Sequence, residues 1–177
     1  MSGKTLTRKT KETQVELRGG EAVKVDTGLP FFDHMLGTLL RYAGLNLELR
    51  ARGDLRHHLI EDVGISLGLF LKDAIPATAR RYGERIIPMD DALVQAVVDV
   101  GGRSYYRGKL PNALYEHFLR SLAENARITL HVRRLRGRDR HHLIEASFKA
   151  VGLALRDACS EGGVLFSTKG AVELEVT

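Results

Sequence analysis

The sequence contains the pattern His-His-x-x-Glu twice, and this pattern could bind metal ions. In a helix, residues four apart lie on one face, while adjacent residues point about 100° apart. The first histidine and the glutamate of each copy can therefore chelate one ion together, and the second histidine is left to serve a different ion. The chelating pairs are His57 with Glu61 and His141 with Glu145, and the remaining histidines are His58 and His142. The spacing predicts two metal ions rather than one.

The two copies belong to a longer internal repeat. A shift of 84 residues places Arg56–Glu61 on Arg140–Glu145 with six identical residues in succession. Continued to Ala74 and Ala158, the same shift gives 11 identities in 19 positions. The chain is therefore interpreted as two copies of one unit, residues 1–86 and 87–177, which together form one compact domain.

The repeat suggests how each metal site is completed. Two equivalent helices that face each other could each donate a chelating pair and lend the second histidine across. One ion would then take His141, Glu145 and His58, and the other would take His57, Glu61 and His142. His34 and His117 are equivalent under the repeat, each follows an acidic residue in an expected helix, and they are the candidates for the fourth ligands.

Six histidines and two carboxylates over two sites leave octahedral positions of Mn²⁺ or Fe²⁺ open for a substrate. Three other interpretations remain at this point. One is a purely structural metal site, and another is a di-metal hydrolase in which a bridging hydroxide attacks a phosphoester or an amide. The third is a non-catalytic protein that assembles when metal is added.

Apolar periodicity predicts the elements that position these residues. Alternation predicts strands at residues 13–17, 23–25, 45–49, 96–100 and 128–132. Helical spacing predicts helices at residues 33–42, 59–74, 114–125 and 140–157, and Pro76 stops the second of them. Strands grouped with helices on one face predict an α+β sandwich of two strand-strand-helix-strand-helix units.

Composition limits the class of protein. Cys159 is the only cysteine, so the chain has neither an intrachain disulfide nor a thiolate metal site. No apolar run approaches the roughly 18 to 20 residues of a membrane span, and we expect a cytoplasmic protein with no membrane partner. The net charge of +5 and the arginine-rich run at residues 133–140 could indicate nucleic acid, but no nucleic-acid motif accompanies them. A solvated basic loop that attracts an anionic substrate is the preferred interpretation.

The ordered set of motifs resembles the imidazoleglycerol-phosphate dehydratase family over nearly the whole chain. Besides the two His-His-x-x-Glu copies, the matching segments are Arg8–Thr13, Phe32–Leu36, Gly53–Leu55, Pro88–Leu93, Gly102-Arg103, Glu116–Phe118, Phe148–Ala150 and Ser167–Gly170. The chain departs from the family pattern where Gly37-Thr38 replaces Asp-Gln and where Arg56 alone separates Leu55 from His57. Neither departure removes a predicted ligand.

The resemblance implies a ribosomal protein S5 domain 2-like fold and two Mn²⁺ per active site, with iron or zinc as alternatives. It implies one manganese on His34, His58, His141 and Glu145, and a second on His57, Glu61, His117 and His142. The substrate phosphate would be bound by Arg81, Arg103, Lys149, Ser167, Thr168 and Lys169. Charge-assisted hydrogen bonds from arginine and lysine suit a phosphate.

The family reaction dehydrates D-erythro-imidazole glycerol phosphate to imidazole acetol phosphate, a step of histidine biosynthesis. The resemblance implies that the di-metal site binds the imidazolate of the substrate, and that Glu12 contacts the substrate and moves protons. It also implies self-association into a large homo-oligomer, a 24-mer, with active sites between subunits.

Overall fold

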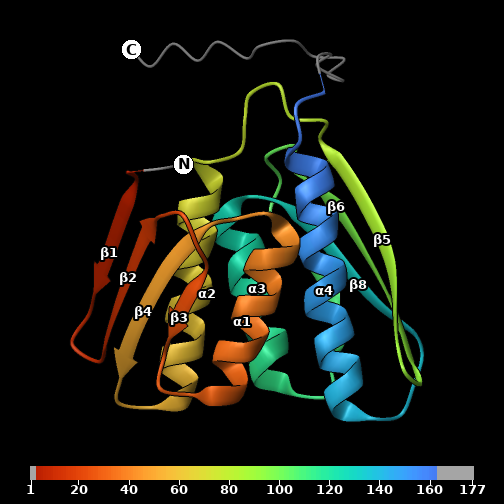
Figure 1. Ribbon diagram of the computed structural model, residues 1–177, viewed down its shortest axis with the longest axis horizontal. Helices are drawn as coiled ribbons and strands as arrows, with labels where there is room; N and C mark the ends of the chain where they lie inside the picture. Colours follow the sequence, from red (N-terminus) through yellow and green to blue (C-terminus); the bar gives the residue numbers. More distant parts are fainter. Residues whose placement is uncertain (1–2, 163–177) are drawn as a thin grey trace.

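The computed structural model describes residues 3–162, and its strands form two four-stranded sheets (Figure 1). The first sheet contains β1 (Thr5–Lys9), β2 (Thr13–Gly19), β4 (Leu47–Gly53) and β3 (Lys24–Asp26), in that order. The second contains β5 (Tyr82–Met89), β6 (Ala92–Asp99), β8 (Thr129–Arg136) and β7 (Tyr105–Gly108), in that order. In each sheet the first three strands are antiparallel and the last is parallel to its neighbour. The two halves of the chain therefore share one topology.

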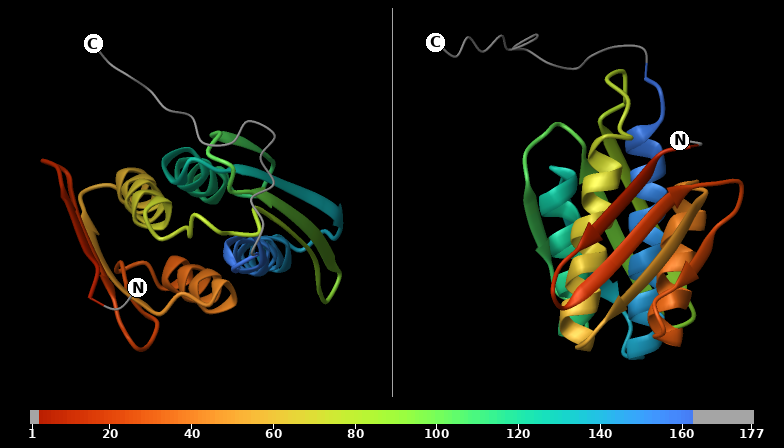
Figure 2. Two further views of the ribbon diagram at one scale, coloured as in Figure 1. Left: turned by 90° about the horizontal axis from the view of Figure 1, so that it is seen from above. Right: turned by 90° about the vertical axis from the view of Figure 1, so that its left-hand side faces the viewer.

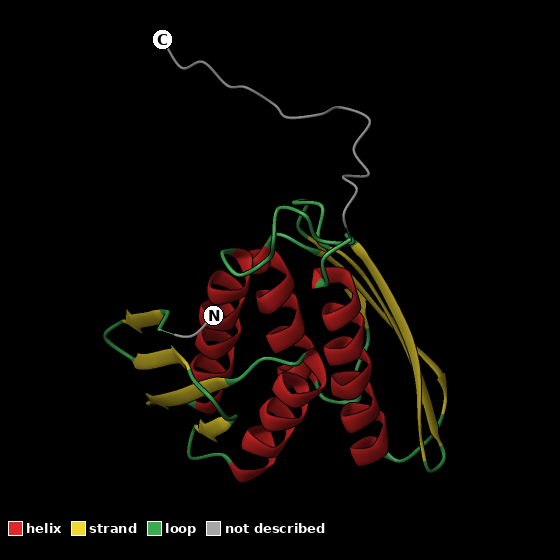
Figure 3. Ribbon diagram, turned by 45° about the horizontal axis from the view of Figure 1, so that its top comes forward, coloured by secondary structure: helices red, strands yellow, loops and turns green. Residues whose placement is uncertain are grey.

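Four helices lie in a layer between the two sheets, as the view from above shows most clearly (Figures 2 and 3). They are α1 (Pro30–Ala43), α2 (Arg56–Lys72), α3 (Ala113–Ala126) and α4 (Arg140–Cys159). Each sheet is thus covered by helices on one face, and β2 shows the result as a strict alternation of buried and exposed residues. The predicted α+β architecture of two repeated halves is confirmed.

The halves meet where α2 packs against α3 and where α1 packs against α4. Gly68 and Gly152, which are equivalent under the repeat, permit these close approaches. A Cβ atom at Gly68 would lie 2.7 Å from the carbonyl oxygen of Leu122, and one at Gly152 would lie 2.7 Å from that of Leu39. Because backbone atoms cannot move aside, the two glycines set the distance between the helices.

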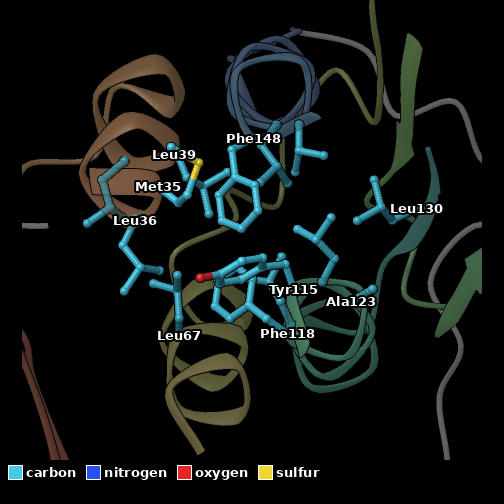
Figure 4. Packing of buried hydrophobic residues seen from close by; sticks show 14 of the residues in the cluster. Met35, Leu36, Leu39, Leu67, Tyr115, Phe118, Ala123, Leu130 and Phe148 are labelled. Carbon is cyan, nitrogen blue, oxygen red and sulfur yellow. The ribbon is translucent and has the colours of Figure 1, made fainter. Parts of the chain in front are cut away.

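Apolar side chains from all four helices fill the space between them (Figure 4). Phe118 of α3 and Phe148 of α4 are fully buried and stack with ring centroids 5.5 Å apart. Phe32 of α1 meets Phe118 edge-on at 5.3 Å, and Met35 and Leu67 close the cluster. One hydrophobic core therefore contains residues of both repeats.

All four predicted helices occur, but the periodicity missed β1, β5 and β7. β1 and β5 are edge strands, and most of their residues stay at least partly exposed, so their apolar residues do not alternate. Because β5 pairs along its length with β6, the expected boundary between residues 86 and 87 falls inside β5. The structure groups residues 82–86 with the second half. Within residues 3–162, no helix is long and apolar enough to cross a membrane.

Candidate metal centre

All eight predicted metal ligands lie near the N-terminal ends of the four helices. These helices begin at the same end of the molecule, which is the lower end in Figure 1. Local sequence explains three of the starts. Pro30 is the first residue of α1, and the side chain of Asn112 accepts a hydrogen bond from the backbone of Leu114 in α3. Asp139 caps α4 in the same way by accepting from the backbone of His142. The helix starts thereby bring residues that are distant in sequence to one end of the bundle.

The first group, here called the α2 cluster, contains His57, Glu61 and His117. The Nε2 atoms of His57 and His117 lie 3.7 and 3.3 Å from the carboxylate of Glu61, on different oxygens. One ligand atom from each of the three residues lies within 4.8 Å of the other two. The Nε2 atom of His117 is buried and has no hydrogen-bond partner among the described residues. A buried, unpaired ring nitrogen directed at a carboxylate fits a shared metal ion, which would sit between the two ligands.

The second group, the α4 cluster, contains His34, His141 and Glu145. The Nε2 atoms of His141 and His34 lie 3.1 and 3.5 Å from the same oxygen of Glu145, Oε2. The other oxygen accepts from Lys149 Nζ at 2.9 Å. Burial acts to raise the pKa of Glu145, but the hydrogen bond and charge of Lys149 outweigh it, so the pKa lies below its usual range. The carboxylate is therefore ionised and suited to bind a cation.

His58 and His142 point away from both clusters. His58 Nδ1 lies 3.2 Å from Asp54 and 3.3 Å from Glu12, and the hydrogen bond to Asp54 raises the pKa of His58. His142 Nδ1 lies 2.9 Å from Asp91, which raises the pKa of His142. Each second histidine is thus held by carboxylates of its own half.

The repeat led us to expect that His58 joins His141 and Glu145 of the same chain, and that His142 joins the other chelating pair. The structure does not show these contacts. Among residues 3–162, His58 gathers with Glu12 and Asp54, not with His141 and Glu145. The physical reason lies in the packing, because α2 packs mainly on α3 and α4 on α1, so the two equivalent helices are not direct partners. Each chelating pair instead receives its third ligand from the helix that it does contact, α3 or α1.

The predicted phosphate-binding residues are split between the two ends of the bundle. Lys149 lies at the metal end, beside Glu145. Arg81 lies at the other end, where its backbone donates to the carbonyl of Ala158 at 3.0 Å and its side chain pairs with Asp99 at 2.9 Å. From His141 to Ala158 the helix α4 rises about 25 Å. Arg103 is at the same far end, since its carbonyl accepts from Thr129 Oγ1 at the start of β8. Ser167, Thr168 and Lys169 lie outside the described residues.

Glu12 lies in the turn between β1 and β2, and its side chain is exposed. Its Oε2 atom is 3.3 Å from His58 Nδ1, while its backbone carbonyl accepts from the backbone of Asp54 at 3.1 Å. Glu12, the expected proton-transfer group, therefore lies next to His58, an expected metal ligand, at the end of the bundle where the helices begin.

Sequence reasoning overlooked the acidic residues that hold His58 and His142. Asp54 precedes His58 by four residues and Asp139 precedes His142 by three, so helical spacing could have indicated both. Asp90 and Asp91 approach His142 from the β5–β6 turn, and only the fold reveals them. Asp91 also accepts from the backbone of Arg138, and these hydrogen bonds lower the pKa of Asp91 to about 2.

A cavity of about 930 Å³ lies beside the second sheet. Its lining includes apolar residues of β6 and α4 and four basic side chains. The basic side chains are Arg107, Lys109, Arg133 and Arg134. None of the eight predicted metal ligands lines this cavity. The cavity is therefore not the candidate metal site.

Comparison with known proteins identifies the family. The family model described as imidazoleglycerol-phosphate dehydratase matches residues 27–155. The chain is 46% identical over 189 residues to the imidazoleglycerol-phosphate dehydratase of Anaeromyxobacter sp. strain K, covering 94% of this chain and 90% of that protein. It is 45% identical over 190 residues to the enzyme of that name from Thermus thermophilus, covering 95% and 98%.

Solved structures agree with the sequence comparison. The structure of the Pyrococcus furiosus protein in complex with (S)-C348 superposes with a TM-score of 0.87 at 38% identity, covering 94% of this chain and all of that one. The Staphylococcus aureus protein gives a TM-score of 0.78 at 32% identity, covering 90% and 100%. The likeness thus extends over at least 90% of the chain. The chain belongs to the imidazoleglycerol-phosphate dehydratase family, the hydro-lyases of histidine biosynthesis.

Proposed function

We propose that this protein converts D-erythro-imidazole glycerol phosphate to imidazole acetol phosphate and water, as a cytoplasmic step of histidine biosynthesis. The observation that carries the proposal is the pair of equivalent three-residue clusters at the helix starts, each with two histidines and one glutamate. Two Mn²⁺ per active site fit these donors, and a different divalent ion of similar preference would fit them too.

His58 and His142 would complete the ligand sets. In this assignment His34, His58, His141 and Glu145 hold one ion, and His57, Glu61, His117 and His142 hold the other. The ions would supply Lewis acidity toward the nitrogens of an imidazole ring. Lys149 holds Glu145 through the 2.9 Å ion pair to Oε1, and Glu145 would thereby stay oriented to hold an ion together with His34 and His141.

Dehydration removes a hydroxyl group from one carbon of the glycerol chain and a proton from the next. The resulting enol then gains a proton on carbon to become the ketone, so the site needs a group that accepts and returns protons. Glu12 suits this role because its carboxylate is accessible at the metal end and makes no hydrogen bond to the backbone of its own turn. Asp91, in the equivalent turn, is already engaged by backbone donors.

The substrate phosphate requires a second binding region. Arg81 and Arg103 lie about 25 Å along α4 from the metal end of the same chain, which is farther than a small phosphorylated glycerol can span. The metal sites have a similar gap, because His58 and His142 point away from the clusters of their own chain and cannot complete their ligand sets there. Both are resolved if the active site lies between subunits of a large homo-oligomer, such as a 24-mer, in which one chain supplies a cluster and its neighbours supply the outer histidines and the arginines.

The decisive experiment measures conversion of imidazole glycerol phosphate by metal-stripped protein before and after addition of Mn²⁺. His57→Ala and His141→Ala each remove one chelating histidine, while His131→Ala removes the one histidine of the sequence that is not a predicted metal ligand and serves as the matched control. We expect turnover only after Mn²⁺ is added, and only in the wild type and in His131→Ala. Two bound ions per chain without turnover would contradict the proposal and favour a di-metal hydrolase or a metal-assembled protein.

A further inference from the structure

The turn that carries Glu12 is tied to α2 by a network of polar side chains beneath the first sheet. Arg8 of β1 forms an ion pair with Asp62 of α2, with Nη1 2.6 Å from Oδ2. Thr13, at the start of β2, donates its hydroxyl to the same carboxylate oxygen. The side chain of Asp62 is only 13% exposed. Asp62 directly follows the cluster residue Glu61, and Thr13 directly follows Glu12.

A directed chain of hydrogen bonds continues from this network to Glu12. A carboxylate can only accept, so the proton of Thr13 goes to Asp62. The Thr10 hydroxyl then donates toward Thr13, whose Oγ1 lies at 3.0 Å and whose backbone carbonyl lies at 3.4 Å. Thr10 Oγ1 in turn accepts from the backbone nitrogen of Glu12 at 3.1 Å and from that of Thr13 at 2.9 Å. Asp54 donates its backbone N–H to the carbonyl of Glu12. Both sides of the Glu12 backbone are therefore held.

The second half of the chain shows that the fold does not require this network. A Cβ atom at Gly53 would meet Thr13 at 2.9 Å, and one at Gly137 would meet Ala92 at 2.7 Å, so Ala92 occupies the position of Thr13. The repeat places Ala146 at the position of Asp62. The same topology thus forms with two alanines where the first half has a hydroxyl and a carboxylate.

Stability does not account for the difference between the halves. A shielded ion pair returns little net stability, because removing two charges from water offsets most of their attraction. Side chains joined by hydrogen bonds, as Thr10, Thr13 and Asp62 are, do however fix one geometry of the groups attached to them. In the first half the attached group is the accessible carboxylate of Glu12.

We propose that Thr13 and Asp62 are positioning residues, which hold Glu12 at a fixed place relative to Glu61 so that its carboxylate can transfer a proton to the substrate. The proposal rests on the proposed dehydratase function. The connection is short, since it runs from Glu12 through Thr10 and Thr13 to the residue next to a metal ligand. A displacement of about 1 Å of a proton-transfer group can lower a rate by roughly 100-fold.

The test compares Thr13→Val, which keeps the shape but removes the hydroxyl, with Thr13→Ser, which restores it. Ser66→Ala is the matched control, because it also removes one buried hydroxyl, that of Ser66 on α2. We expect Thr13→Val to lower kcat about 10- to 100-fold per metal-loaded chain, with KM and the bound Mn²⁺ unchanged. Thr13→Ser is expected to recover most of the rate, and Ser66→Ala to keep all of it.

A purely structural role would give a different pattern. Thr13→Val would then lower the melting temperature or the fraction of chains that bind metal, but kcat per metal-loaded chain would equal that of the wild type, and the positioning role would be refuted. Failure of Thr13→Ser to recover the rate would refute it as well. If the wild type itself binds two ions and shows no turnover, the dehydratase function fails first, and the positioning role fails with it.

Discussion

His117 Nε2 lies 3.3 Å from Glu61 Oε1, shielded from solvent and without a hydrogen bond to it or to any other described residue. A buried polar atom without a partner costs roughly 1–3 kcal/mol, so native structures rarely keep one without a reason. A metal ion between the two atoms would remove that cost. The relationship therefore leads directly to a prediction about metal content.

His117→Ala and His34→Ala should each lower the bound Mn²⁺ from two ions per chain to about one, because each removes a ligand of a different cluster. Metal analysis of the dialysed protein measures the stoichiometry. His131→Ala should keep both ions, since His131 lies on β8 against Tyr105 and in neither cluster. Two ions retained in both His117→Ala and His34→Ala would show that the clusters are not the metal sites.

Glu12→Gln should lower kcat by about 10²- to 10⁴-fold, the usual contribution of a positioned acid or base. The amide keeps the size of the side chain but cannot accept a proton. Metal content should stay at the wild-type level, because Glu12 belongs to neither cluster. Steady-state kinetics on metal-loaded protein tests this, with Glu16→Gln on the adjoining strand β2 as the control. An unchanged kcat in Glu12→Gln would remove Glu12 from the reaction.

Gly152→Ala should destabilise the fold by about 1–3 kcal/mol through overpacking, because its Cβ would lie 2.7 Å from the carbonyl oxygen of Leu39. The sign is informative, since Gly→Ala within a helix ordinarily stabilises by about 0.5–1 kcal/mol. Gly37→Ala on α1 is the control, because its Cβ would approach only the mobile end of Arg41, at 3.4 Å. Urea unfolding should give opposite shifts for the two variants, and equal shifts would argue against the close approach of α1 and α4.

Ser66→Ala should leave stability unchanged or raise it by about 1 kcal/mol. The hydroxyl of Ser66 is fully buried on α2 and has no hydrogen-bond partner among residues 3–162. The repeat places Ala150 at the equivalent position of α4, where an apolar side chain is accommodated. Thermal unfolding measures the effect. A clear loss of stability would show that the hydroxyl has a partner, such as a bound water.

Cys159 should react slowly with thiol reagents in the native protein. Burial raises the pKa of its thiol to about 11, so only about one thiol in a thousand is ionised at pH 8. The rate of labelling should rise with pH up to that value and should increase strongly in guanidinium. Rapid labelling of the folded protein at pH 8 would contradict the burial of this end of α4.

Short-range spacing made much of the site predictable. The pairing of His57 with Glu61 and of His141 with Glu145 follows from helical geometry within five residues, and the repeat reveals that the two pairs are equivalent. The helices were predictable for the same reason, because their buried faces recur every three to four residues. Strands β1 and β5 were not predicted, because they bury too few side chains to show an alternating apolar pattern.

The sequence by itself therefore determined the helices, the repeat and the chelating pairs, all of which depend on contacts between residues a few positions apart. Residue spacing alone did not decide which pair His34 and His117 join; the family resemblance assigned His117 to Glu61 and His34 to Glu145, and the structure shows both contacts. Only the tertiary structure directed His58 and His142 away from both clusters and placed Arg81 at the opposite end of α4. These relationships depend on α2 packing against α3 and α4 against α1, and the packing of whole helix faces leaves no signature in the spacing of any single segment.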